Sequence, residues 1–158
     1  MDVELKTLLP ARVAYMRHVG PYGDSGISRM WQRFGAWCEQ NGLLLPTRNI
    51  FGLSHDSPDV TAPDKCRYDA CIEIDAVFQP QGEVGTQHLQ GGRFACTRVI
   101  GTADDIHAAW MRLFAGWLPD SGYQVDDRSC VEWYDTGAGV DPKTGAFSCL
   151  LCLPVRAG

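Results

Sequence analysis

The stretch CVEWYD at residues 130–135 places a single carboxylate, Glu132, among Cys, Val, Trp and Tyr. The segment is otherwise typical of a half-buried strand, in which neighbouring side chains point to opposite faces. Burying a carboxylate among apolar groups is costly unless it is paired, and aromatic faces attract delocalised cations. These residue types predict a counter-charge for a bound cation. The alternative is a glutamate that simply points to water.

Aromatic residues could form the walls of such a site, although core packing is the alternative for each of them. The chain has five Trp, five Tyr and six Phe. We expect Trp37 and Trp117 to pack in the core, and strand alternation should turn Trp133 away from Glu132. The candidates for contact with a ligand, besides Glu132, are Tyr134, Tyr22, Trp31, Trp110, Tyr68, Phe51 and Phe147.

The sequence motifs give little support for a metal site, a catalytic triad or a nucleotide-binding site. Cys149 and Cys152 form a CxxC pair, but their apolar neighbours predict a strand, which sends the two thiols to opposite faces, so we expect no metal site. The four histidines are scattered and indicate no catalytic triad. The glycine-rich GPYGDSG (20–26) lacks the lysine of a nucleotide-binding loop, and we expect no cofactor.

Length and charge narrow the class of protein. With 158 residues, of which 45% are hydrophobic, the chain predicts one domain over 1–158. A net charge of −5, with 14 scattered basic residues, argues against a nucleic-acid surface. We find no secretory signal and no apolar run of membrane-spanning length, and the seven cysteines are an odd number. We therefore expect a cytoplasmic protein with reduced thiols.

An internal repeat sets the positions of the candidate residues. RVAYMRHVG (12–20) and RFACTRVIG (93–101) share Arg, Ala, Arg and Gly at the same spacing, and each reads as a strand that ends at a glycine. A helical pattern and two further strands follow each segment. We predict an α+β fold, a duplicated β-α-β-β unit in halves of about 1–80 and 81–158, with one antiparallel sheet packed against two helices. A pseudo-twofold axis would relate the halves, with a ligand cleft between them.

Each predicted helix has one apolar stripe at spacings of three and four residues. The stretch TADD (102–105) resembles a capping box with Asp in place of Glu, and Gly42 and Gly122 mark the two helix ends. The stripes are Ile27, Met30, Trp31, Phe34, Trp37 and Cys38 in the first helix, and Ile106, Trp110, Leu113, Phe114 and Trp117 in the second.

The repeat also aligns Glu132 of the second half with Gly52 of the first. A charge that the fold itself required would more naturally occur in both halves. A glutamate opposite a glycine therefore indicates an asymmetric site, although a solvated strand face could vary in the same way.

The chain resembles the GyrI-like small-molecule-binding domain, also called the AraC-type effector-binding domain, through segments that cover nearly its whole length. These are VAYMRHVGPYG, RYDACIEI, GGRFACTRVIG, LFAGWLPDSGY, VEWYD and a closing LCLPV. The resemblance implies a pocket between the halves, in which a buried glutamate faces aromatic side chains and meets lipophilic cations. It assigns that role to Glu132, with Tyr134 beside it. Unlike the family's regulators, the sequence shows no helix-turn-helix, so direct DNA binding is not expected.

The leading hypothesis is a stand-alone module that binds a lipophilic, cationic small molecule and acts as a drug or toxin sensor or as a sequestering protein. The resemblance leaves two alternatives. One is a hydrolase that opens reactive cyclopropane-containing toxins, in which Glu132 would act as an acid or a base. The other is a DNA gyrase inhibitor, so that the partner would be a protein such as DNA gyrase or a transcription regulator.

Overall fold

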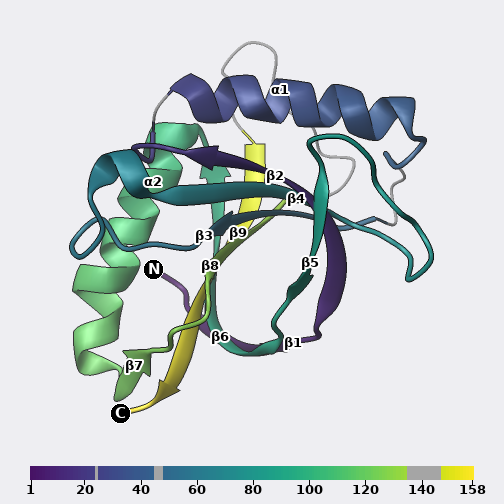
Figure 1. Cartoon of the computed structure of the whole chain (residues 1–158). Coiled ribbons are helices and arrows are strands. Elements are labelled where there is room, and N and C mark those ends of the chain that lie inside the picture. The colour runs from purple at the N-terminus through teal and green to yellow at the C-terminus, as the bar shows by residue number, and fades with distance from the viewer. Residues whose placement is uncertain (24, 45–47, 135–146) are drawn as a thin grey trace.

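The computed structural model describes residues 1–23, 25–44, 48–134 and 147–158. Within them, nine strands form an antiparallel sheet and two α-helices, α1 (Ser25–Gln40) and α2 (Ala103–Arg112), pack against it (Figure 1). The strands are β1 (Glu4–Leu8), β2 (Ala11–Val19), β3 (Ile50–Ser54), β4 (Arg67–Glu73), β5 (Gly85–Leu89), β6 (Gly92–Gly101), β7 (Tyr123–Val125), β8 (Cys130–Tyr134) and β9 (Phe147–Ala157).

The sheet curls into a half-barrel. Its strand order is β1-β6-β9-β8-β3-β4-β2-β5, with β7 paired to β9. Strands β1 and β2 are far apart in this order, yet only Leu9 and Pro10 join them along the chain. Strands β5 and β6 are joined just as closely, by Gln90 and Gly91. The sheet must therefore bend until its two edges approach each other, as Figure 1 shows.

Each face of the curled sheet carries its own core. Apolar side chains fill the inside of the curl. On the outer face, α1 packs on β2 and β4, and α2 packs on β6 and β9. Alternation along β8 shows the division, because Val131 and Trp133 belong to the inner core whereas Glu132 and Tyr134 contact the helix side.

The predicted stripe of α1 is confirmed, since all six of its residues pack in the same cluster on the outer face. Gly42, with a φ of +66°, takes the left-handed conformation that follows the end of this helix. At the start of α2, the Thr102 backbone N–H donates to the Asp105 carboxylate at 2.8 Å, as the capping box predicted.

The prediction for the end of α2 is partly wrong. After Arg112 the chain continues as a π-helical turn, Leu113–Trp117, and then as a 3₁₀ turn, Leu118–Asp120; another 3₁₀ turn is Pro63–Lys65. A π turn takes in one more residue than an α turn and so shifts the register of the side chains that follow. Phe114, which was predicted to be on the apolar stripe, is 39% exposed.

The predicted α+β fold is confirmed, with one antiparallel sheet and two helices. The strand pairings of the two halves correspond: β2 pairs with β4 as β6 pairs with β9, and β3 pairs with β4 as β8 pairs with β9. The β3–β8 pair joins the halves. The duplication itself stays a prediction. Trp37 stacks on Phe34 and Trp117 stacks on Tyr123, in the packing expected for both tryptophans.

The cysteines are distributed over both cores. Cys149 lies under α2, whereas Cys152 lies inside the curl, so the strand separates the two thiols of the CxxC pair as expected. None of the seven cysteines, all of which lie in the described ranges, forms a disulfide. Among those same ranges, no helix combines the length and the apolar character needed to cross a membrane.

Candidate functional site

Glu132 lies near the middle of the sheet, where β8 pairs with β3, and it is only 9% exposed. Its register partner is Gly52. A Cβ atom at residue 52 would collide with the Tyr68 hydroxyl and with the Glu132 carboxylate. The absence of a side chain at Gly52 therefore leaves the space that the Tyr68 hydroxyl and the Glu132 carboxylate occupy.

Three neutral side chains donate hydrogen bonds to the Glu132 carboxylate. The hydroxyls of Tyr68 and Tyr134 donate to Oε1 at 2.7 Å and 2.8 Å, and the Trp110 indole Nε1–H donates to Oε2 at 3.3 Å. The Tyr68 oxygen accepts the Nε1–H of Trp31 at 3.3 Å. Because Trp31 belongs to α1 and Trp110 to α2, hydrogen bonds connect the carboxylate to both helices, directly to α2 and through Tyr68 to α1.

Both phenols remain neutral and act as donors. Burial and the nearby Glu132 charge hold the pKa of Tyr68 well above its usual value. Burial, the Glu132 charge and the Tyr68 hydroxyl do the same for the pKa of Tyr134. Two hydroxyl protons are thus directed at one carboxylate oxygen, and neither donor brings a charge.

Aromatic rings surround this group of hydrogen bonds. Trp31 packs edge-on against Tyr134, with ring centroids 5.4 Å apart, and against Tyr68 at 6.4 Å. Tyr134 packs against Phe147 at 5.7 Å. The structure therefore gathers six of the eight predicted residues in one place. The six are Glu132, Tyr134, Tyr68, Trp31, Trp110 and Phe147.

Two predicted residues lie elsewhere. Phe51 precedes Gly52, so alternation turns it into the curl, where it packs against Trp133 at a centroid distance of 5.8 Å. The Tyr22 hydroxyl lies 3.0 Å and 2.9 Å from the backbone carbonyls of Asp56 and Arg67. It therefore connects the segment that follows β3 to the first residue of β4. Burial raises the pKa of Tyr22 to about 12.

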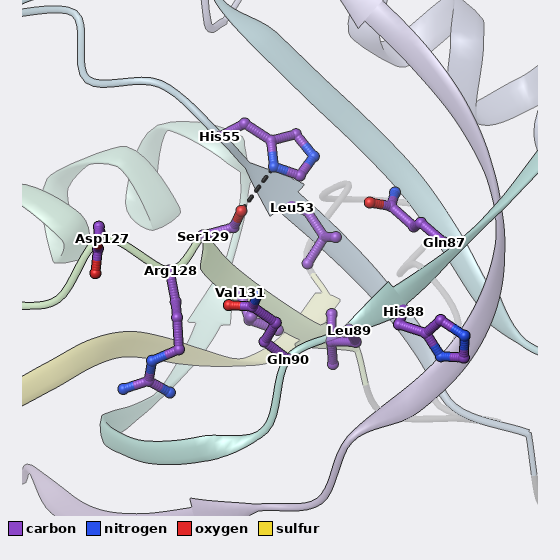
Figure 2. Close-up of a pocket in the computed structure, with 10 residues that line it drawn as sticks. All are labelled: Leu53, His55, Gln87, His88, Leu89, Gln90, Asp127, Arg128, Ser129 and Val131. Atoms are coloured by element: carbon purple, nitrogen blue, oxygen red, sulfur yellow. Dashed lines mark hydrogen bonds between the residues drawn. The ribbon is translucent and has the colours of Figure 1, made fainter.

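The predicted ligand cleft between the halves stays a prediction. Between the halves on the outer face, the rings around Glu132 pack against one another. A cavity of about 260 Å³ lies instead on the other face, inside the curl, and residues such as Leu53, His55 and Ser129 line it (Figure 2). A ligand at Glu132 would have to separate rings that are in contact here.

A second buried carboxylate, Asp69, was missed by sequence reasoning. It has no exposed surface and accepts two hydrogen bonds from Arg17, from Nε at 2.7 Å and from a terminal nitrogen at 2.9 Å. His55 Nε2 lies 2.6 Å away, and Gln87 donates at 2.8 Å. Burial alone would raise the pKa of Asp69, but the hydrogen bonds from Arg17, His55 and Gln87 lower it to about 2. Asp69 thus has the cationic partner that Glu132 lacks among the described residues.

Comparison with known families agrees with this architecture. Residues 1–156 match the GyrI-like small molecule binding domain. The chain belongs to the GyrI-like family. A GyrI-like relative from Edwardsiella ictaluri (strain 93-146), named DNA gyrase inhibitor, is 30% identical over 161 residues that cover 99% of each protein.

Two solved structures share the GyrI-like fold. The EcmrR C-terminal domain matches with a TM-score of 0.79 at 19% identity, over 99% of this chain and 98% of that chain. SAV2435 bound to tetraphenylphosphonium matches with a TM-score of 0.69 at 15% identity, over 99% and 94%. EcmrR was also solved in complex with DNA, where this chain covers 58% of the EcmrR chain. These comparisons do not support the expectation that this GyrI-like chain lacks direct DNA binding. That expectation stays a prediction.

Proposed function

We propose that this small-molecule-binding domain takes up lipophilic organic cations and that Glu132 is their counter-charge. The observation that carries the proposal is the contrast between the two buried carboxylates. Asp69 is neutralised by the Arg17 guanidinium, whereas the three donors that reach Glu132 are neutral. A buried charge without an ionic partner is unfavourable, and a bound cation would relieve that cost.

The surrounding rings suit a cation of delocalised or shielded charge. Trp31, Tyr134 and Phe147 offer broad apolar area, and Trp and Tyr faces attract cations electrostatically. The ligand would enter by parting these rings, with its charge nearest the Glu132 oxygens. Such a site selects for charge and aromatic bulk more than for one molecular structure.

The tetraphenylphosphonium bound to SAV2435, a protein of the same fold, is a ligand of this chemistry and supports the choice of probe. The cytoplasm, where thiols stay reduced, is the compartment that we propose from the cysteine content. There the domain would act as a sensor or a sequestering module for toxic cations.

The test is a tryptophan-fluorescence titration with tetraphenylphosphonium and with neutral triphenylphosphine oxide. Wild type is compared with Glu132→Gln, which keeps an amide oxygen as acceptor for the two phenols. We expect saturable binding of the cation, weakened at least about tenfold in Glu132→Gln, a loss of roughly 1.4 kcal/mol. The neutral analogue should bind weakly and equally to both proteins. Equal affinity of the two proteins for the cation would refute the role of Glu132.

The same variant separates the two alternatives raised by the sequence. If the domain hydrolyses cyclopropane-containing toxins, Glu132→Gln should abolish turnover while the protein still binds the toxin. If it acts chiefly through a protein such as DNA gyrase, the substitution of a buried residue should leave complex formation nearly unchanged. The gyrase alternative rests on the name of the Edwardsiella relative, and the hydrolase alternative rests on the resemblance.

A further inference from the structure

A serine, a histidine and an aspartate form a hydrogen-bonded chain on the sheet face opposite Glu132. The Ser129 hydroxyl oxygen lies 2.6 Å from His55 Nδ1, and His55 Nε2 lies 2.6 Å from Asp69 Oδ2. His55 directly follows β3 and Ser129 directly precedes β8. The β3–β8 register, which pairs Ser54 with Cys130, places His55 opposite Ser129 one step further along.

The hydrogen-bond roles along this chain are fixed by Asp69. The ionised carboxylate can only accept, so the His55 proton must lie on Nε2. In the neutral imidazole, Nδ1 is then an acceptor, and the Ser129 hydroxyl donates to it. This is the order of donors and acceptors found in serine hydrolases, in which an oriented imidazole takes the proton of a serine hydroxyl. The two ring nitrogens exchange places relative to the chymotrypsin arrangement.

The chain borders the cavity inside the curl. Figure 2 shows His55 and Ser129 joined at one side of this cavity, above Leu53 and Val131. Leu89 completes an apolar floor, and Gln87, which donates to the same Asp69 oxygen that His55 contacts, also lines the cavity. The cavity of about 260 Å³ is slightly smaller than the usual range for drug-sized ligands, so it suits a short acyl group.

We propose that this cavity is a second site of the protein, a hydrolytic one, in which Ser129 is the nucleophile for small carboxylic esters and His55 is its general base. Ser129 Oγ forms a bond to the ester carbonyl carbon while its proton passes to His55 Nδ1. The tetrahedral intermediate then breaks its bond to the alkoxy oxygen, which leaves as an alcohol with that proton. Water attacks the acyl-serine, gives its proton to His55 and releases a carboxylic acid, and the proton returns to Ser129.

The surroundings of Asp69 limit the rate of ester hydrolysis that we expect. Arg17 shares the carboxylate charge through two hydrogen bonds, so Asp69 stabilises a protonated His55 less than an aspartate without a cationic partner would. Asp69 and Arg17 are therefore positioning residues for the imidazole. We expect slow turnover of activated esters and efficient covalent capture by an irreversible serine reagent.

The experiment combines p-nitrophenyl acetate hydrolysis with labelling by a fluorophosphonate probe on the full chain. We expect the wild type to hydrolyse the ester at least about tenfold faster than Ser129→Ala, and His55→Gln to be as slow as Ser129→Ala. Ser54→Ala is the matched control, since it removes the same hydroxyl from a residue beside His55 whose strand position faces the other side of the sheet. It should keep the wild-type rate.

Mass spectrometry of the labelled wild type should place the phosphonyl group on Ser129, and heat-denatured protein should remain unlabelled. This readout does not depend on the folding of any variant. Hydrolysis that persists in Ser129→Ala would show that a histidine alone reacts with the ester, and it would overturn the proposal. So would a native protein that carries no adduct at Ser129.

Discussion

Gly52 and Glu132 are register partners across β3 and β8, and the missing side chain of the glycine leaves the room that the glutamate carboxylate occupies. Gly52→Ala would drive a Cβ atom into the Tyr68 hydroxyl and the Glu132 carboxylate, both in a packed region. We expect a loss of about 1–3 kcal/mol in the free energy of unfolding, as for other overpacked cores. Urea denaturation followed by circular dichroism measures this loss.

The control for that substitution is Gly35→Ala. Gly35 lies within α1, and an added Cβ atom there meets nothing within 4 Å. Because alanine favours the helix over glycine, this variant should be more stable than the wild type by up to about 1 kcal/mol. If both variants changed stability in the same direction, the steric explanation for Gly52 would be wrong.

The Tyr68 hydroxyl links Glu132 to Trp31, since it donates to Glu132 and accepts from Trp31. Tyr68→Phe would leave the Trp31 N–H without this acceptor and remove one of two donors to Oε1. We expect a loss of about 1–3 kcal/mol in unfolding free energy, the range for a buried polar group deprived of its partner. Tyr123→Phe, at a ring that stacks on Trp117, is the control and should change little. Equal urea midpoints for the wild type and Tyr68→Phe would contradict the network.

Asp69 should make stability depend on acid pH. Its pKa falls from 3.8 to about 2 on folding, so the folded state favours the charged carboxylate. The resulting stabilisation of about 2 kcal/mol is fully present above the unfolded pKa near 4 and is lost as pH falls through 2. Urea midpoints between pH 5 and pH 2 should therefore fall less steeply for Asp69→Asn than for the wild type.

Two comparisons complete the acid test. Asp69→Asn leaves the partly exposed Arg17 guanidinium without its charged partner, so it should also cost about 2 kcal/mol at neutral pH. Asp120→Asn, at an exposed aspartate, should keep the wild-type pH profile. A profile for Asp69→Asn as steep as that of the wild type would show that other carboxyls cause the acid sensitivity.

The sequence contained enough information to find the surroundings of Glu132. Aligning the two halves put Gly52 against Glu132, and these residues pair in the sheet. Trp31 and Trp110 were predicted at related helix positions. Trp110 donates to the Glu132 carboxylate, and Trp31 donates to the Tyr68 hydroxyl, which in turn donates to that carboxylate. Phe51 could have been excluded beforehand, because the alternation that turned Trp133 away from Glu132 also turns Phe51 away from Gly52.

The site of Asp69 and His55 was harder to foresee. Ser129 and His55 are 74 residues apart, and only the strand register brings them together. In the antiparallel register they lie three steps beyond the Gly52–Glu132 pair, whereas the predicted alignment of the two halves equates repeat positions and does not give this register. The partners of Asp69 on β2 and β5, however, depend on how the sheet curls, which local patterns do not encode. The π-helical turn after Arg112 was likewise not predicted, because the apolar stripe of the second helix continues through it at ordinary helical spacing.

Single tryptophan replacements can locate the cation within the domain. Trp31 and Trp110 contact the group around Glu132, whereas Trp133 lies on the inner face and donates to Asn49 at 3.2 Å. Tetraphenylphosphonium bound at Glu132 should quench the first two indoles. We therefore expect Trp31→Phe and Trp110→Phe each to reduce the quenching amplitude, and Trp133→Phe to preserve it. Amplitude lost mainly in Trp133→Phe would place the cation in the inner cavity beside Val131 and refute binding at Glu132.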